Sequence, residues 1–284
     1  MLFKTLADVE TEKLRQAFLE AFSDYSVPVD MPIDRFQTFL KGNGFVPELS
    51  IGAFEGHTLC GFIINGVREW QGVLTAYDGG TGVVPAWRKQ GITTRLMEVL
   101  AETLPARGVK QYLLEVIKTN TPAYNLYLKQ GFAVNREFDC YRTAKKDIKV
   151  GIAHAVRYFQ GDFEMDGHTA GPMWDYHPSW QNSLDSIAAI QNETVAAAVY
   201  SEGKIAGYGI IHAKTGGVSQ LAIDRNCRNR GVGRSLLAAL AGKTEAEIIS
   251  FINVDSECTS MKGFLGAMGF HLEVQQYEMV KKLG

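Results

Sequence analysis

The sequence lacks any apolar run of the roughly 18 or more residues that a membrane-spanning helix needs. Its first residues also lack the basic start and apolar block of a secretory signal peptide, so we expect a cytoplasmic protein with no membrane partner. Cysteine is scarce as well: Cys60, Cys140, Cys227 and Cys258 are scattered, with no CxxC pair. Free thiols in a reducing compartment are therefore favoured over disulfides, and no metal site is expected.

An excess of charge of one sign is also missing. The 29 Lys and Arg residues nearly balance the 31 Asp and Glu residues, and the net charge is −2. No extended basic stretch is visible, so a nucleic-acid partner is not expected. With 46% hydrophobic residues, the 284-residue chain can form the cores of one large or two ordinary globular domains.

Two common phosphate-binding loops are absent. No segment matches GxxxxGK[ST], which excludes a Walker loop. The dinucleotide motif GxGxxG is not completed either, because Leu236 stands where a third glycine would follow Gly231 and Gly233.

The sequence contains an internal repeat, two similar segments of 14 residues. "RKQGITTRLMEVLA" runs from Arg88 to Ala101, and "RNRGVGRSLLAALA" runs from Arg228 to Ala241, 140 positions later. The pair Gly131-Phe132 recurs 138 positions later as Gly269-Phe270. An offset of nearly half the chain indicates two copies of one domain and not a solenoid, whose period is about 20–50 residues. We predict domains over 1–145 and 146–284, with a charged seam in 142–150.

Each half mixes strands and helices in the same order. In the first half, apolar spacing predicts helices at 11–22, 32–41, 91–104 and 121–130, and strands at 49–55, 58–69, 72–85, 110–117 and 132–142. In the second half it predicts strands within 194–213, 216–224, 246–254 and 270–280, with helices starting at 231 and ending before 269. The irregular, aromatic segment 162–181 receives no assignment.

The repeated segment reads as a loop, R-x-x-G-x-[G/T], that opens a helix. A helix start exposes N–H groups without intrahelical partners, and its dipole favours an anion by roughly 0.3–1 kcal/mol. Glycine lets a phosphate approach the backbone. Arg88, Lys89, Arg228 and Arg230 add positive charge at the loops. The residues alone therefore predict a phosphate or pyrophosphate site in each half.

Together with the downstream stretch "EVIKTNTPAYNLYLKQGF", these loops resemble the GNAT acetyltransferase superfamily, as two tandem domains. The resemblance implies an α/β (α+β) fold in which each domain has a mixed, mostly antiparallel sheet flanked by helices. It also implies acetyl-CoA as the cofactor and transfer of its acetyl group to an amine of a small molecule or peptide. The implied cofactor-binding residues are Val83, Val84, Arg88, Lys89, Gln90, Gly91, Ile92, Thr93 and Asn120 in the first half and Leu221, Ala222, Ile223, Arg228, Asn229, Arg230, Gly231, Val232 and Gly233 in the second.

The resemblance also implies roles in the chemistry. Tyr127 matches the tyrosine that protonates the departing thiolate, and a backbone N–H at Val83 or Val84 would stabilise the oxyanion. The base that accepts the amine proton is predicted from position in the sequence: Glu115, Asp78 and Glu69 lie on or beside strands that could line the acceptor cleft. We take Glu115 as this base, with Asp78 and Glu69 as alternatives.

Two departures from the family pattern separate the halves. Thr93 crowds the first loop, whereas the second half has Leu265 and Cys258 where the tyrosine and asparagine are expected. We therefore predict catalysis in the N-terminal domain. The reverse assignment stays open, because Gly233 gives the cleaner loop and "PMWDYHPSW" could form a wall of an acceptor pocket. A different acyl-CoA, a hydroxyl acceptor, or a non-catalytic acyl-CoA sensor also remain alternatives, and the oligomeric state is not predicted.

Overall fold

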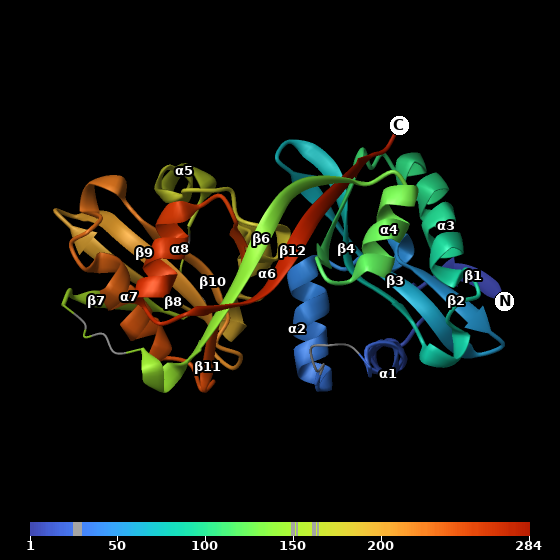
Figure 1. The fold of residues 1–284 in the computed structure, drawn as a ribbon, viewed down its shortest axis with the longest axis horizontal. Coiled ribbons are helices and arrows are strands. Elements are labelled where there is room, and N and C mark those ends of the chain that lie inside the picture. Colours follow the sequence, from blue (N-terminus) through green and yellow to red (C-terminus); the bar gives the residue numbers. More distant parts are fainter. Residues whose placement is uncertain (25–29, 149–150, 152, 161–162, 164) are drawn as a thin grey trace. The chain divides into compact units, whose positions relative to one another are not determined.

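The chain folds into two compact units (Figure 1). The computed structural model describes residues 1–24, 30–148, 151, 153–160, 163 and 165–284. Unit 1 comprises residues 1–135 and 278–284, and unit 2 comprises residues 136–277. The last two residues of the predicted seam, and residues 162 and 164 of the unassigned segment, lie outside the described residues.

Unit 1 has a mixed sheet with helices packed against it. Its elements are β1 (Leu2–Thr5), α1 (Thr11–Ala21), α2 (Ile33–Asn43), β2 (Ile51–Glu55), β3 (Thr58–Trp70), β4 (Val73–Val83), α3 (Ile92–Ala106), β5 (Gln111–Ile117), α4 (Thr121–Lys129) and the start of β6 (Ala133–Ala144). Strands β1 to β4 pair antiparallel in chain order, and β5 pairs parallel to β4. The apolar faces of α1 and α2 meet one face of this sheet, where Phe18, Phe36 and Phe62 form part of the core.

Unit 2 repeats much of this order. Its elements are the rest of β6, β7 (Val156–Phe159), α5 (Gly167–Ala170), α6 (Leu184–Ala189), β8 (Thr194–Ser201), β9 (Lys204–His212), β10 (Val218–Ile223), α7 (Val232–Ala241), β11 (Ile248–Asp255), α8 (Thr259–Ala267) and most of β12 (His271–Lys282). Strands β7 to β10 form an antiparallel sheet in the order β10-β9-β8-β7. Leu236 and Leu240 of α7 pack on one face of this sheet, and Tyr208 and Ile210 belong to a second core on its other face.

Strands β6 and β12 each contribute to both units. In unit 2, the part of β6 that follows Arg136 pairs antiparallel with β11. In unit 1, the last part of β12 lies next to β5 in the strand order, and Met279 is fully buried there. Glu278 accepts a hydrogen bond from Asn135 at 2.7 Å, and the N–H of Leu283 donates to the carbonyl of Lys110 at 2.8 Å. The final residues of the chain are therefore part of the first unit.

The observed architecture confirms the predicted fold class, and the repeated helices begin at the matching residues Ile92 and Val232. Strands β1 and β7 and helices α5 and α6 were not predicted, because each is short. The domain division after residue 145 stays a prediction about the sequence repeats, whereas the compact units divide within β6. No helix in the described part of the chain is both long and apolar enough to cross a membrane.

Candidate functional site

The two repeated loops have the same backbone conformation. In the first, Lys89 and Gly91 have φ of 62° and 74°. In the second, Asn229 and Gly231 have φ of 59° and 85°. Each glycine is the last residue before a helix, and its positive φ is a conformation that glycine adopts without the steric cost of a Cβ.

Both loops present a row of backbone N–H groups. Among the described residues, no hydrogen bond is formed by the N–H groups from Lys89 to Thr93, or by those from Asn229 to Gly233. The first intrahelical bonds run from Arg95 to Gly91 and from Ser235 to Gly231. Such a row of N–H groups at a helix start is suited to bind a phosphate.

The first arginine of each loop holds the loop to its own unit. The Nε of Arg88 donates to the carbonyl of Val83 at 3.1 Å, and its guanidinium forms an ion pair with Asp24. In the second loop, the Nε of Arg228 donates to the carbonyl of Ile223 at 3.1 Å, and Nη1 donates to Asp175 at 2.8 Å. These contacts give both arginines a structural role, while their contribution to cofactor binding stays a prediction.

The strand before each loop separates from its parallel neighbour at a β-bulge. In β4 the register against β3 shifts at Gly79, and pairing with β5 extends only to Asp78. In β10 the register against β9 shifts at Ser219, 140 positions later, and the parallel pairing with β11 is a single bridge between Gly217 and Ser250. Because bulges bend a strand and end regular pairing, each leaves a strand edge open beside the loop.

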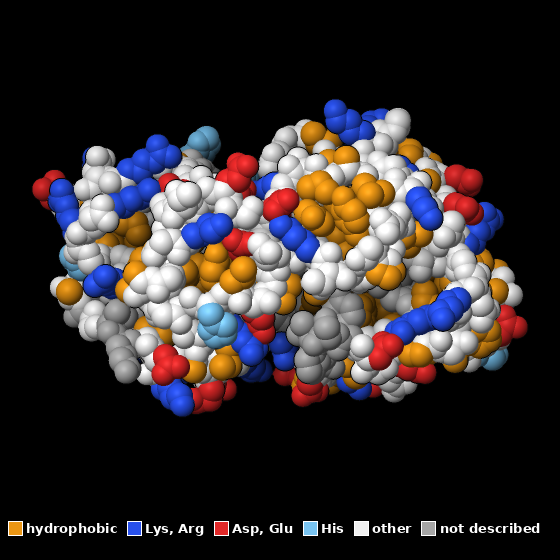
Figure 2. Space-filling view, viewed as in Figure 1, with side chains coloured by type: hydrophobic (Ala, Val, Ile, Leu, Met, Phe, Trp, Pro, Cys, Tyr) orange, Lys and Arg blue, Asp and Glu red, His pale blue; other side chains and the backbone are white. Residues whose placement is uncertain are grey.

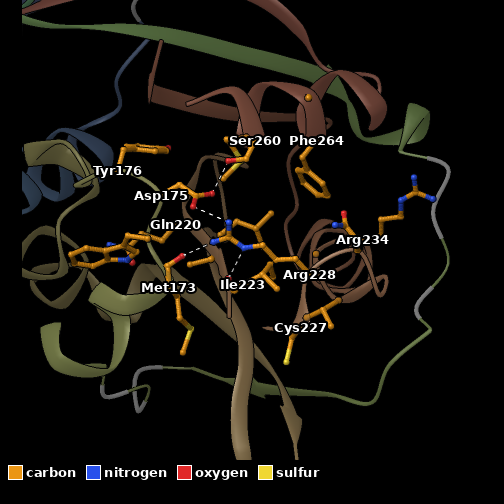
Figure 3. Close-up of a pocket in the computed structure, with 18 of the residues that line it drawn as sticks. Met173, Asp175, Tyr176, Gln220, Ile223, Cys227, Arg228, Arg234, Ser260 and Phe264 are labelled. Carbon is orange, nitrogen blue, oxygen red and sulfur yellow. Dashed lines mark hydrogen bonds and ion pairs between the residues drawn. The ribbon is translucent and has the colours of Figure 1, made fainter. Parts of the chain in front are cut away.

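In unit 2, a cavity of about 730 Å³ lies beside this open strand edge and the loop (Figure 3). Its lining includes the predicted residues Leu221, Ala222, Ile223, Arg228, Asn229, Gly231, Val232 and Gly233. The other walls come from segment 173–178 and from the first turns of α8, including Ser260 and Phe264. The structure therefore brings eight of the nine predicted second-half residues together around one cavity.

Helix α8 packs closely against the second loop. A Cβ on Gly233 would lie 3.3 Å from the ring of Phe264, so a larger residue at this position would require the ring to shift. Leu265, which occupies the sequence position of Tyr127, is completely buried in the core of unit 2. The second half therefore has a closely packed glycine loop but presents no phenol from α8.

In unit 1, several of the predicted site residues have backbone or side-chain contacts within the protein. The N–H of Val84 donates to the carbonyl of Cys60 at 2.9 Å, so it is not free to stabilise an oxyanion, which leaves Val83 for that predicted role. The side chain of Asn120 accepts a hydrogen bond from the N–H of Ala123 and caps α4. Tyr127 is 7% exposed and packs edge-on against Phe132.

The three carboxylates predicted as candidates for the base lie in different surroundings. Glu115 accepts a hydrogen bond from the hydroxyl of Tyr77. Glu69 is exposed near the turn between β3 and β4, at the opposite end of that hairpin from the loop. Asp78 lies at the bulge, where it accepts hydrogen bonds from the N–H of Gly80 and the hydroxyl of Thr81.

Burial raises the pKa of Asp78 to about 6, against an ordinary value of 3.8, although both hydrogen bonds lower it. A carboxyl with a raised pKa binds its proton more tightly in the folded state, so it makes stability fall as pH rises from about 4 to about 6. We expect Asp78→Asn to stabilise unit 1 relative to wild type by an amount that grows over this range and then stays constant, on the order of 2–3 kcal/mol. Urea unfolding at several pH values measures this. The exposed Asp8→Asn serves as the control, and an equal gain at pH 4 and pH 7 would contradict the expectation.

Segment 173–178 is the main part of the cavity wall that the sequence did not assign. Its aromatic character was the one signal that pointed to a pocket. Trp174 donates from Nε1 to the hydroxyl of Tyr208 at 2.8 Å, which in turn donates to Gln220 at 2.6 Å. Gln220 lines the cavity floor, so a buried chain of polar groups fixes this wall against β10.

Positive charge near the two loops comes from a few basic side chains. Figure 2 shows acidic and basic side chains interspersed on the face in view. Lys89, Arg230 and Arg234 are exposed at or next to the loops. An anionic ligand would therefore be attracted by these side chains and by the loop N–H groups, and not by a wide basic surface on that face.

The comparisons with known proteins identify the family of each half of the chain. The model of the Acetyltransferase (GNAT) family matches residues 11–132, and that of the Acetyltransferase (GNAT) domain matches residues 176–280. No curated protein sequence matches the chain.

Several solved structures share the fold along the full chain. One is described as a tandem GNAT protein from the clavulanic acid biosynthesis pathway, without AcCoA; the match has a TM-score of 0.72 at 14% identity and covers 100% of this chain and 98% of that one. Another is a GCN5-related N-acetyltransferase from Sphaerobacter thermophilus, with a TM-score of 0.71 at 13% identity over 99% and 95% of the two chains. A putative acetyltransferase from Pyrococcus horikoshii has a TM-score of 0.70 at 15% identity over 99% and 89%.

Proposed function

Given that the chain belongs to the GNAT acetyltransferase family, with one domain of that family in each half, we propose that it transfers an acetyl group from acetyl-CoA to an amine. The transfer is direct, and the acceptor is a small molecule or a peptide. The observation that carries this proposal is the cavity of unit 2, which joins an anion-binding loop, an open strand edge and a polar and aromatic wall.

The loop of unit 2 suits the pyrophosphate of the cofactor. Its N–H groups from Asn229 to Gly233 lack protein acceptors among the described residues, and the dipole of α7 favours negative charge at this point. Each charge-assisted hydrogen bond to such a group contributes about 1.5–3 kcal/mol. The exposed Arg230 and Arg234 add positive charge beside them.

The open edge of β10 suits the amide-containing arm of the cofactor. Beyond the bridge at Gly217, β10 has no parallel partner among the described strands. Residues Leu221 to Ile223 line the cavity, so an extended ligand with amides can pair with the open edge of this strand as an added strand does.

The chain contributes position and hydrogen bonds to the chemistry. Acetyl-CoA would supply the acetyl group as a thioester, whose thiol leaves readily because its pKa is about 8.5. A backbone N–H on the β10 edge would stabilise the developing oxyanion, and the walls would hold the amine against the carbonyl carbon. A protonated amine near pKa 10 must first lose a proton, so turnover is expected to rise with pH.

This assignment differs from the sequence-based prediction, which placed the chemistry in unit 1. That prediction remains the second candidate, and one observation favours it. Asp78, Tyr112 and Tyr127 interact electrostatically on unit 1, and Asp78 has a pKa of about 6, which is suited to a general base. In this alternative, Tyr127 would assist the departing thiolate and Glu115 or Asp78 would accept the amine proton.

The release of free thiol from acetyl-CoA tests the proposed function. The purified chain is incubated with acetyl-CoA and a panel of amines comprising polyamines, amino acids, amino sugars and peptides with free N-termini. We expect thiol release with at least one amine class, matched by an equal amount of acetylated amine in mass spectrometry. Tight CoA binding without turnover on any amine would instead favour an acyl-CoA sensor.

A further inference from the structure

Unit 2 lacks the phenol that α4 provides in unit 1. The N–H of Phe132 donates to the carbonyl of Tyr127, and the N–H of Phe270 donates to the carbonyl of Leu265, both at 3.0 Å. The two helices therefore end in the same way, and Leu265 occupies the place of Tyr127. Because Leu265 is buried and aliphatic, α8 offers no hydroxyl to the cavity at this position.

A different tyrosine lines the same cavity. Tyr176 belongs to segment 173–178, and Figure 3 shows it among the lining residues, together with Asp175 and Ser260. Thr259 and Ser260, in the first turn of α8, line this cavity too, and Ser260 donates a hydrogen bond to Asp175, the residue before Tyr176, at 2.6 Å. Tyr176 therefore belongs to the part of the cavity wall that contacts the start of α8, the counterpart of the start of α4 in unit 1.

The backbone on both sides of Tyr176 is held in place. Asp175 accepts hydrogen bonds from Arg228 at 2.8 Å and from the hydroxyl of Ser260 at 2.6 Å. On the other side, Arg136 donates to the carbonyl of His177 at 2.6 Å. The segment is thus tied to the cofactor loop and to the first turn of α8, the two elements that define the cavity. Such fixation preorganises a side chain for a specific contact.

The hydroxyl of Tyr176 forms no hydrogen bond with any described residue. Burial is the largest cause that raises the pKa of Tyr176 well above its ordinary value of 10, so the phenol keeps its proton at neutral pH. A phenol that stays protonated can donate to an anion in the cavity throughout the pH range of the reaction.

We propose that Tyr176 is a catalytic residue of unit 2, and that its hydroxyl donates a hydrogen bond to the cofactor sulfur as the thiolate departs. This inference rests on the proposed function. In the step, the amine nitrogen bonds to the carbonyl carbon, the C–S bond breaks, and its electron pair goes to sulfur. The nitrogen gives its proton to water, the thiolate departs with the electron pair of the C–S bond, and Tyr176 keeps its own proton throughout the step.

Binding of CoA and of desulfo-CoA, which lacks the thiol, tests this contact without knowledge of the acceptor. Calorimetry at pH 8.5, where part of the free thiol is ionised, compares the wild type with Tyr176→Phe, Tyr127→Phe and the exposed control Tyr158→Phe. We expect the wild type and Tyr158→Phe to bind CoA about 3- to 10-fold more tightly than desulfo-CoA, which corresponds to the usual net free energy of one hydrogen bond. Tyr176→Phe should bind both ligands equally.

Turnover provides a second readout on an amine that the wild type acetylates. We expect Tyr176→Phe to lower kcat by about 10- to 100-fold, at or below the lower end of the roughly 10²–10⁴-fold that a general acid contributes, because Tyr176 donates a hydrogen bond and keeps its proton. The KM for acetyl-CoA should change by less than about 3-fold. An unchanged preference for CoA and an unchanged kcat in this variant would overturn the role of Tyr176. Loss of both only in Tyr127→Phe would overturn it too, in favour of unit 1. A wild type that binds neither ligand would instead contradict the proposed function itself.

Discussion

The Gly231→Trp variant is expected to lose acetyl-CoA binding in unit 2 by more than about 100-fold and to lose turnover with it. Gly231 has φ of 85° and stands immediately before α7, in the middle of the loop N–H groups that no described residue accepts a hydrogen bond from. An indole at this position would occupy the space of the phosphate and displace two or more charge-assisted hydrogen bonds. At about 1.5–3 kcal/mol each, their loss corresponds to at least this fold-change. Calorimetric titration and thiol release measure the two effects.

Two further glycine variants make the result specific. Gly203→Trp changes a glycine of similar φ, 78°, in open space at the turn between β8 and β9, so it matches the backbone strain without touching the cavity. Gly91→Trp places the same side chain in the loop of unit 1, where a Cβ would also meet open space. If Gly91→Trp abolishes turnover and Gly231→Trp does not, the chemistry belongs to unit 1. Circular dichroism checks that each variant folds.

Removal of residues 278–284 is expected to unfold unit 1 while unit 2 stays folded. The deletion takes the end of β12 out of unit 1, together with the fully buried Met279 and the hydrogen bonds of Glu278 and Leu283. It leaves β5 without the strand that lies next to it in the sheet order. Hydrogen exchange followed by mass spectrometry should show loss of protection in peptides from residues 1–135 and retained protection in those from 136–277.

Point substitutions provide a milder form of this test. Met279→Ala should destabilise unit 1 by about 2–5 kcal/mol, because a large apolar side chain is removed from a filled core. The neighbouring Lys282→Ala is exposed and should change stability by less than about 0.5 kcal/mol. Full protection of unit 1 in the deletion variant would show that its sheet is stable without the end of the chain.

Local features of the site were accessible from the sequence, because a short stretch of residues determines each of them. A glycine before an amphipathic helix, preceded by an apolar strand, fixes the loop conformation, and the 140-residue shift lays Gly91 on Gly231. The β-bulges at Gly79 and Ser219 are also 140 positions apart. Neither bulge was predicted from the sequence. The elements themselves were also largely predicted, since apolar periodicity reflects one buried face.

Features that depend on residues far apart in the chain were not accessible. The ion pairs of Arg88 with Asp24 and of Arg228 with Asp175 join residues 64 and 53 positions apart. The position of Tyr176 depends on such contacts, and nothing in its local sequence distinguishes a cavity wall from an ordinary loop.

By itself, the sequence determined the duplication, the order of strands and helices, and the two glycine loops that we predict to bind an anion, because these follow from local conformation and from the spacing of apolar residues. Only the tertiary structure decided that the chain's last residues complete unit 1 and that a cavity is formed around the second loop. Both depend on which strands become neighbours, and that choice is made by the packing of whole sheets and helices, with energies spread over many distant residues.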